Sequence, residues 1–252
     1  SKLRTDVINA DPDGVNINDQ CGSTHMDALA AMVKAGHYDM GIAFDGDADR
    51  CLAVDEQGSL IDGDQIMAAC GLDMKNKGQL PGNTVVATVM SNLGFHTYSK
   101  ENGIALECTD VGDRNVLERM VEKGYRLGGE QSGHMIFLDH ATTGDGQLTA
   151  LKILALLKES GKKASQVFSA CPRYPQVLIN VPVADNDVKK AAIASPLLSQ
   201  AVAREEEALA GEGRVLVRPS GTEALMRVMV EAKTEELARE TAQRLADLIP
   251  EL

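Results

Sequence analysis

Three aspartates alternate with small residues in the segment 45–50, which reads DGDADR. Apolar runs at 41–44 and 51–54 flank this segment and are typical of strands, and alternate residues of an extended chain point to one side. Three converging carboxylates repel one another unless a hard cation lies between them, and Mg²⁺ prefers a few carboxylates together with phosphate oxygens. The spacing therefore predicts a phosphate-handling Mg²⁺ site whose ligands are Asp45, Asp47 and Asp49.

Two other interpretations of this segment are weaker. The D-x-D-x-D spacing followed by Glu56 imitates a calcium-binding helix–loop–helix, but that loop needs Gly where Arg50 stands, and its flanks are helices rather than strands. A solvated acidic turn is common in general. A fixed cation such as Arg50 beside three acids suits a transferring phosphoryl group better than it suits a plain turn.

A second loop has the residue types that bind phosphate. Segment 218–223 reads RPSGTE and lies between two strand-like runs. A glycine lets backbone N–H groups turn inward around an anion, hydroxyl groups add donors, and arginine offers a bidentate fork. An ordinary hairpin containing Pro and Gly is the alternative. The predicted phosphate-binding residues are Arg218, Ser220, Gly221 and Thr222, with Arg227 close enough to assist.

A third loop, GGEQSGH at 128–134, combines glycines with a carboxylate, an amide, a hydroxyl and an imidazole. Close backbone approach and many hydrogen-bonding groups suit a polyhydroxylated or aminated ligand. Glu130 and Ser132 are the better candidates for such contacts. An imidazole can move a proton near neutral pH, so His134 is a candidate for proton transfer, although a single His beside a strand is more often a structural donor.

The composition limits the partners. Lys and Arg number 25 against 37 Asp and Glu, a formal net charge of -12, which opposes binding to nucleic acid or to an anionic membrane. No apolar run reaches the roughly 18 residues of a membrane helix. The five cysteines are odd in number and show no C-x-x-C spacing, which favours reduced thiols in a cytosolic protein.

The chain of 252 residues suggests about two modules or more. Strand-like and helix-like segments alternate through the first 170 residues, which predicts an α/β architecture of βαβ units with parallel sheets. The expected strands are 5–9, 39–44, 51–55, 84–89, 104–109 and 135–138. The expected helices are 24–36, 64–77, 93–102, 113–123 and 147–160.

The pattern changes after a Pro-rich interruption at 171–175. Strands are expected at 177–183, 214–217 and 225–230, one long polar helix at 188–210, and an amphipathic helix at 234–249. This β-α-β-β-α order predicts a separate α+β unit with helices on one face of an antiparallel sheet.

The three loops, in this order and at these distances, resemble those of the phosphohexomutase family. Three further segments, 16–25, 89–94 and 142–146, are similar to its bacterial glucosamine-phosphate branch. The resemblance covers essentially the whole chain. It implies three-layer αβα domains followed by a smaller α+β C-terminal domain, in an enzyme that interconverts glucosamine 6-phosphate and glucosamine 1-phosphate for UDP-N-acetylglucosamine and cell-wall synthesis.

In that family, a phosphoserine of the first domain gives its phosphoryl group to the sugar. The resemblance implies that the three aspartates hold Mg²⁺ against that serine and that Arg50 steadies the transferring group. It also implies that Glu130 and Ser132 contact the sugar, with His134 nearby. The non-reacting phosphate would be clamped by Arg218, Ser220, Gly221, Thr222 and Arg227.

The family's serine motif, T-A-S-H-N, does not occur here, and the chain does not begin with Met. We therefore expect residues 1–60 to be the remainder of domain two, 61–171 domain three and 172–252 domain four, with the phosphoserine domain outside this chain and no turnover by this piece alone. Asp110 departs from the family pattern, which leaves the general acid or base open between His134 and residues near Asp113 and Arg114. Phosphomannose or phosphoglucose substrates and a non-catalytic phosphosugar-binding module also stay open. Because an incomplete sheet would expose a strand edge and apolar surface, we expect this chain to associate.

Overall fold

The computed structural model describes residues 3–221 and 223–251, and the chain divides into two compact units. The first unit contains the residues up to Ser91 together with Phe95–Pro172. The second unit contains Asn92–Gly94 and the residues from Arg173 onward. The three-part division at residues 60 and 171 stays a prediction.

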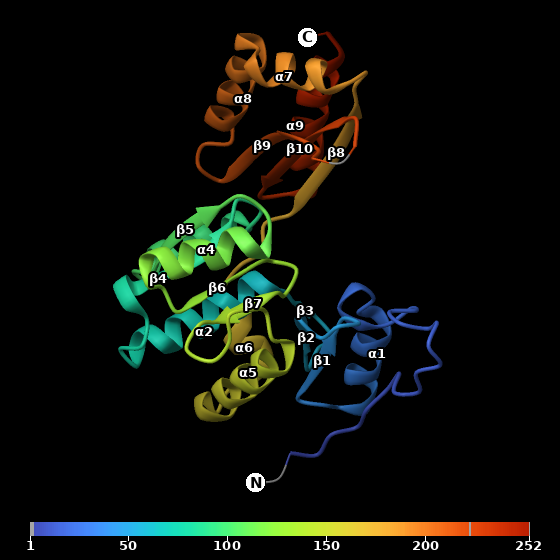
Figure 1. Ribbon diagram of the computed structural model, residues 1–252, viewed down its shortest axis with the longest axis vertical. Helices are drawn as coiled ribbons and strands as arrows, with labels where there is room; N and C mark the ends of the chain where they lie inside the picture. Colours follow the sequence, from blue (N-terminus) through green and yellow to red (C-terminus); the bar gives the residue numbers. More distant parts are fainter. Residues whose placement is uncertain (1–2, 222, 252) are drawn as a thin grey trace. The chain divides into compact units, whose positions relative to one another are not determined.

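The first unit begins with a small antiparallel sheet in the order β1-β2-β3, with helix α1 beside it (Figure 1). Phe44 pairs with Cys51, so the DGDADR segment is the loop of a hairpin. The expectation of a parallel sheet is wrong here, because a six-residue loop is too short for the crossover that parallel strands need. The elements are η1 (Gly22–Thr24), α1 (Asp27–Gly36), β1 (Met40–Phe44), β2 (Cys51–Asp55) and β3 (Leu60–Ile61).

A second sheet of the same unit has the order β5-β4-β6-β7 and is mixed. Strand β4 pairs in parallel with β5, as the sequence predicts. It also pairs in parallel with β6, which is not among the expected strands, and β7 runs antiparallel to β6. The elements are α2 (Gly63–Asn76), η2 (Pro81–Asn83), β4 (Thr84–Thr88), α3 (Leu93–Glu101), β5 (Ala105–Thr109), α4 (Asp113–Lys123), β6 (Leu127–Gly129), β7 (Met135–Phe137), α5 (Gly146–Ser160) and α6 (Ala164–Phe168).

Alternate residues of β4 face two different cores. Val85 and Ala87 pack with the helix α2 residues Ile66 and Met67, whereas Val86 packs with residues of α4 on the other face. Alternation of this kind follows from the period of two in a strand. The result is the three-layer αβα arrangement that the resemblance implies.

The expected strand at 5–9 is absent, since no strand is assigned to these residues. They are exposed, and the Tyr38 hydroxyl donates to Asp6 Oδ2 at 2.6 Å. A strand needs a hydrogen-bonded neighbour, and in the described part of the chain β1 pairs with β2 alone. No helix among the described residues combines the length and the apolar character needed to cross a membrane.

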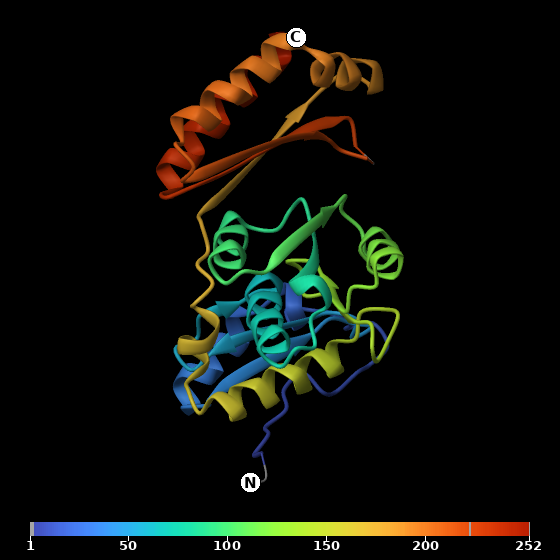
Figure 2. The same cartoon turned by 90° about the vertical axis from the view of Figure 1, so that its left-hand side faces the viewer.

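The second unit is an antiparallel sheet in the order β8-β10-β9 with helices on one face, as expected (Figure 2). The predicted long helix at 188–210 is wrong, because Ser195 is extended (φ -69°, ψ 123°) ahead of Pro196, as the residue before a proline usually is. The elements are β8 (Gln176–Pro182), α7 (Asn186–Ala194), α8 (Pro196–Ala208), β9 (Gly213–Pro219), β10 (Leu225–Ala232), α9 (Glu235–Leu248) and η3 (Ile249–Glu251).

Candidate metal and phosphosugar site

The β1–β2 hairpin loop brings three carboxylates together. Asp45, Asp47 and Asp49 each offer an oxygen, and these oxygens lie within 4.8 Å of one another. The loop folds this way because Ala48 N donates to Asp45 O at 3.1 Å, and Ala48 itself takes a left-handed φ of 59°. Oxygen donors at this spacing fit a small hard cation. The donor set therefore agrees with the Mg²⁺ site that the sequence predicts.

Electrostatics in this loop favour a cation as well. Burial raises the pKa of Asp49 most, and a hydrogen bond with Asp45 and the charge of Asp45 raise it further. A carboxyl group with a raised pKa resists ionisation beside its neighbours. A divalent cation would offset that repulsion and keep the acids ionised.

Arg50 extends along the same loop. Its backbone N–H donates to Asp45 Oδ1 at 3.1 Å, and its Nε lies 3.7 Å from Asp45 Oδ2 and 4.0 Å from Asp49 Oδ1. The side chain is 43% exposed, and its Nε has no hydrogen-bond acceptor among the described residues. The guanidinium is thus held near the acids without being saturated by them, which leaves donors for an anionic ligand.

The structure brings the GGEQSGH loop beside the metal loop. Arg50 and His134 form a β-bridge, and Cys51 N donates to Gly133 O at 3.0 Å. Gly133 has a φ of +97°, and a Cβ there would lie 2.6 Å from Cys51 O, so the close approach requires glycine. Two loops far apart in sequence therefore form one site within the first unit.

Glu130 is oriented by its neighbours. Its Oε1 accepts from Gly112 N at 2.9 Å, and its Oε2 accepts from the Ser132 hydroxyl at 3.5 Å. The turn that precedes the acid–base candidates Asp113 and Arg114 thus contacts this carboxylate through Gly112. Each oxygen retains a lone pair for a ligand hydroxyl or amine.

His134 is buried, with a side chain only 4% exposed. Its Nε2 accepts from Gly144 N at 3.1 Å and lies 3.6 Å from Asp49 Oδ2. A nitrogen that accepts carries no proton, so this bond places the proton on Nδ1, for which the described residues offer no partner. The geometry favours a positioning role, and the catalytic role of His134 stays a prediction.

Two glycines behind the metal loop are missing from the sequence-based candidates. Gly146 N donates to Ala48 O at 2.9 Å, and a Cβ at Gly146 would lie 2.6 Å from Arg50 O. A Cβ at Gly144 would lie 2.3 Å from the His134 ring. Gly144 and Gly146 flank Asp145 in the TTGDG segment, and this spacing is the sequence signal that could have identified them. We call these two residues the glycine pair.

The second unit contains the predicted phosphate loop between β9 and β10. Arg218 and Arg227 are direct cross-strand partners, and Arg227 also pairs with Glu223 at 3.1 Å. Ser220 is buried, and its hydroxyl accepts from Glu223 N at 3.2 Å, whereas Gly221 is exposed. Thr222, the remaining predicted contact, lies outside the described residues.

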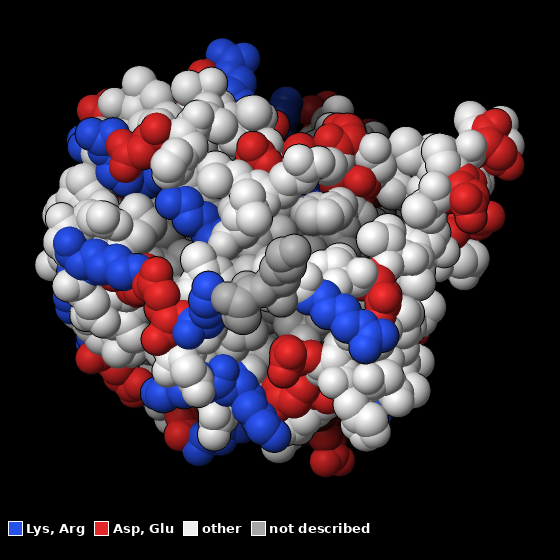
Figure 3. Space-filling model, turned by 90° about the horizontal axis from the view of Figure 1, so that it is seen from below, with Lys and Arg blue, Asp and Glu red and all other residues white. Residues whose placement is uncertain are grey.

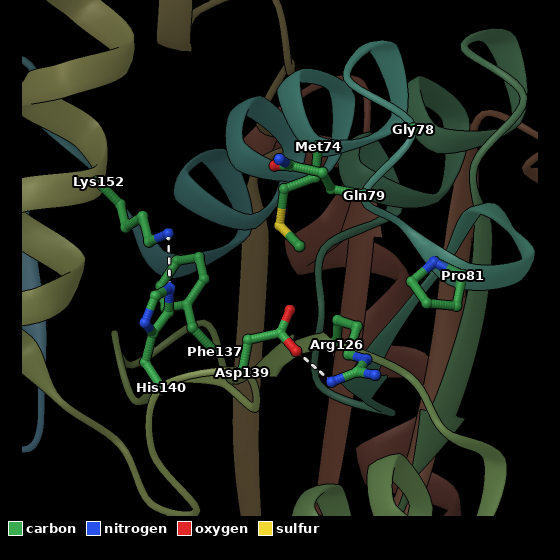
Figure 4. A pocket seen from close by; sticks show the side chains of 9 residues that line it. All are labelled: Met74, Gly78, Gln79, Pro81, Arg126, Phe137, Asp139, His140 and Lys152. Carbon is green, nitrogen blue, oxygen red and sulfur yellow. Dashed lines mark hydrogen bonds and ion pairs between the residues drawn. The ribbon is translucent and has the colours of Figure 1, made fainter.

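A separate pocket of about 610 Å³ lies in the first unit (Figure 4). Arg126 lines it just before β6, whereas Glu130 follows the other end of that strand. Lys152 contacts His140 at 3.1 Å, and Arg126 pairs with Asp139 (Figure 4). None of the predicted site residues lines this pocket, and its charged groups contact one another in pairs.

Positive and negative side chains are interspersed on the face viewed from below (Figure 3). This face therefore shows no continuous basic surface of the kind that nucleic acid requires. The loops described above are better suited to a compact anion than to a polyanion.

The fold is of the α/β class, and its loops carry three clustered carboxylates, a segment rich in hydrogen-bonding groups and a pair of opposed arginines. Family models described as phosphoglucomutase/phosphomannomutase match in sequence order. Alpha/beta/alpha domain II matches residues 6–58, alpha/beta/alpha domain III residues 62–174, and the C-terminal domain residues 178–248. The chain belongs to this phosphohexomutase family.

Curated relatives share about half of the chain's residues. The phosphoglucosamine mutase of Ruminiclostridium cellulolyticum is 54% identical over 248 residues, which is 98% of this chain and 55% of that protein. The phosphoglucosamine mutase of Ligilactobacillus salivarius is 51% identical over 244 residues, which is 97% of this chain and 54% of that protein. The chain therefore spans about half the length of the curated relatives that it matches.

Solved structures share the fold at low identity. Aspergillus fumigatus N-acetylphosphoglucosamine mutase, in complex with GlcNAc-6P and magnesium, superposes with a TM-score of 0.76 at 23% identity and covers 93% of this chain and 53% of that chain. A putative phosphomannomutase from Thermus thermophilus gives a TM-score of 0.63 at 21% identity, covering 89% of this chain and 50% of that chain. These likenesses support the fold alone.

Proposed function

We propose that this chain is the metal-, sugar- and phosphate-binding part of a phosphoglucosamine mutase, an isomerase that interconverts glucosamine 6-phosphate and glucosamine 1-phosphate. The observation that carries the proposal is the convergence of Asp45, Asp47 and Asp49 within 4.8 Å, on a loop bridged to the segment that bears Glu130. Relatives of that name at 51–54% identity support the choice of substrate.

Each loop would supply one part of phosphoryl transfer, which depends mostly on positioning and on charge neutralisation. Mg²⁺ bound by the three aspartates would neutralise charge on the phosphoryl oxygens. The Arg50 guanidinium, close to two of those aspartates, would hold the transferring group. Glu130 and Ser132 would orient the sugar through its hydroxyl and amino groups, and Arg218 and Arg227 would hold the phosphate that does not react.

A phosphate-carrying serine is also part of the proposal. The family models that match are those of domains II, III and IV, and no T-A-S-H-N string occurs in residues 1–252. We propose that this serine lies outside the chain and that the chain alone does not turn substrate over. A cytoplasmic location fits the five cysteines, which are odd in number and show no C-x-x-C spacing.

The decisive experiment is a coupled assay on the protein expressed from the complete reading frame. We expect conversion of glucosamine 6-phosphate that requires Mg²⁺ and is lost in Asp47→Asn. Higher kcat/KM with mannose 6-phosphate or glucose 6-phosphate would replace the substrate assignment. If the complete protein binds glucosamine 6-phosphate in calorimetry but converts none of the three, it is a binding module and the mutase proposal fails.

A further inference from the structure

A lysine lies beneath the phosphate loop, and neither the sequence motifs nor the family resemblance assigns it a role. Lys189 is in α7 and is only 7% exposed. Its Nζ donates to Ser220 O at 2.9 Å and to Glu223 O at 2.5 Å. Buried lysines are rare unless a carboxylate pairs with them. Among the described residues no carboxylate does so here, and both acceptors are neutral backbone carbonyls.

These two bonds set the direction of the loop's peptide groups. The chain contains no cis peptide bond among the described residues, and in a trans peptide the C=O and the following N–H point in opposite directions. Because the carbonyls of Ser220 and Glu223 point toward Lys189, the N–H groups of Gly221 and Ala224 point away from it. A Cβ at Gly221 would meet nothing within 4 Å, and Gly221 is exposed, so the loop is open at this residue.

The lysine acts from a fixed support. Asp185 caps α7 by accepting from Asp187 N at 2.9 Å and from Val188 N at 3.0 Å, which anchors the turn that carries Lys189. On the loop side, Ser220 N donates to Leu225 O at 2.9 Å. The ammonium group of Lys189 thus connects a capped helix with a loop that is closed by the hydrogen bond from Ser220 N to Leu225 O. Both ends of this connection are fixed by hydrogen bonds from backbone N–H groups.

We propose that Lys189 is a positioning residue for phosphate. By holding two carbonyls on the inner side, it aims backbone N–H groups at the open side, and its buried positive charge stabilises an anion there without touching it. Backbone N–H groups that point outward from a turn can bind an anion. This inference rests on the proposed function, since it assigns a role within the phosphate loop.

A purely structural lysine is the competing explanation. Such a lysine would satisfy buried carbonyls and support the fold without changing the affinity for an anion. The two explanations differ in one measurable respect, because only the positioning role links the lysine to phosphate binding at Gly221.

The test is a titration of the chain with inorganic phosphate, followed through the amide signal of Gly221 in ¹H–¹⁵N NMR spectra, with chloride as the salt control. Lys189→Met removes the charge and the donors at similar length, and Lys190→Met is the matched control, since Lys190 is an exposed neighbour. We expect phosphate to bind Lys189→Met at least about tenfold more weakly, and Lys190→Met to bind like the wild type. Lys189→Arg, which keeps the charge, should recover part of the loss.

Thermal midpoints of the same variants separate folding from binding. Lys189→Met that folds and binds phosphate like the wild type overturns the proposal, as does a weakening of the same size in Lys190→Met. If Lys189→Met does not fold, the proposal is tested in the wild-type protein through the NMR signal of the Lys189 ¹⁵Nζ during phosphate titration. A shift of that signal on phosphate addition supports the proposal, and a signal that saturating phosphate leaves unmoved overturns it.

Arg218→Met distinguishes this inference from the proposed function. If wild-type protein binds phosphate and Arg218→Met does not, phosphate binding by the loop at 218–223 is supported. The Lys189→Met result then tests the role of Lys189 alone. If wild-type protein shows no phosphate-dependent change at Gly221, the phosphate loop itself is wrong, and the inference about Lys189 falls with it.

Discussion

Arg218 of β9 lies directly opposite Arg227 of β10 in the antiparallel register. Like charges on directly opposed residues destabilise a sheet. Glu223 offsets the charge of Arg227 at 3.1 Å, and the pKa of Arg218 is lowered first by burial and then by the charge of Arg227. An anion shared by the two guanidinium groups would relieve this repulsion. Anion binding therefore accounts for the Arg218–Arg227 pair better than a contribution to sheet stability does.

Replacing Arg218 should therefore separate phosphate affinity from stability. In Arg218→Met, we expect phosphate to bind at least about tenfold more weakly, because a bidentate donor is lost. The free energy of unfolding should stay the same or rise, because the repulsion with Arg227 is removed. Phosphate titration and urea denaturation of the same samples measure the two quantities.

Arg239→Met provides the control, since Arg239 is an exposed arginine of the same unit that pairs with Glu235. It should leave phosphate affinity unchanged. A loss of stability above about 1 kcal/mol in Arg218→Met would show that this arginine supports the sheet instead.

Replacing the individual aspartates of the DGDADR loop should lower the free energy of unfolding by different amounts. Asp45 accepts from Arg50 N and has a side chain only 8% exposed, whereas Asp47 is exposed. We expect both Asp45→Ala and Asp47→Ala to abolish Mg²⁺ binding in calorimetry. Only Asp45→Ala should lower the free energy of unfolding, by about 1–2 kcal/mol, because it leaves a partly buried N–H group without its acceptor. Equal stability losses would contradict this assignment of roles.

Local patterns in the sequence predict much of the fold. The alternation of the β8–β10 strands and the position of the DGDADR loop follow from local periodicity, and the parallel pairing of β4 with β5 follows from the helix between them. Strand β6 was not predicted. Pro196 could also have predicted the break between α7 and α8, because a proline disfavours helix in the residue before it. The continuous polar character of 188–210 favoured a single helix instead. The hairpin of β1 and β2 could have been recognised from its short loop.

Other features depend on tertiary contacts that spacing alone does not reveal. Gly146 N donates to Ala48 O across a long stretch of sequence, and Gly144 N donates to His134 Nε2 across a loop. The acceptor role of His134 Nε2 follows from that contact rather than from its motif. The cross-strand pairing of Arg218 with Arg227 depends on the register of the hairpin, which a one-residue shift would have changed.

A substitution in the glycine pair, Gly144 and Gly146, tests whether the backbone position of the DGDADR loop controls Mg²⁺ binding. In Gly146→Ala, the new Cβ would meet Arg50 O at 2.6 Å and Ala48 O at 2.8 Å, both backbone atoms, so the metal loop must move. We expect Mg²⁺ affinity to fall about 10–100-fold, as when the groups that support metal ligands are lost. Gln147→Ala, an exposed change in the same helical turn, should bind Mg²⁺ normally. Calorimetric titration with MgCl₂ compares them, and normal binding by Gly146→Ala would exclude this glycine from metal binding.

Self-association is expected through the apolar surface near residues 3–46. Leu3, Val7, Val15 and Ile17 are each at least 68% exposed, and this segment lines a groove of about 1160 Å³. Exposed apolar patches of this kind promote association. The apparent mass in light scattering should rise with protein concentration, and Val7→Ser combined with Val15→Ser should reduce the rise. A monodisperse monomer at all concentrations would contradict this expectation.

Glu231 is the fully buried carboxylate at the centre of a polar cluster in the second unit. It accepts from Leu93 N at 2.8 Å and from Asn92 Nδ2 at 3.2 Å, and it pairs with Arg214 Nε at 3.2 Å. Burial raises its pKa and outweighs the opposing effects of Arg214, of the Leu93 N–H and of the more distant Arg173. The acid of this cluster is thus harder to ionise in the folded protein than in the unfolded chain.

This raised pKa predicts a particular pH dependence of stability. Above the unfolded glutamate pKa of about 4.3, the folded protein holds a proton that the unfolded chain has lost, so stability falls as pH rises through the folded pKa. In Glu231→Gln this titration is absent. We expect the unfolding free energy of wild type minus that of Glu231→Gln to decrease with pH across this window, by at most about 1.4 kcal/mol per pH unit. Urea denaturation of both proteins at several pH values measures it. A difference that grows with pH would mean that Arg214 dominates and holds the carboxylate ionised, because a depressed pKa gives stability that appears only as the pH rises.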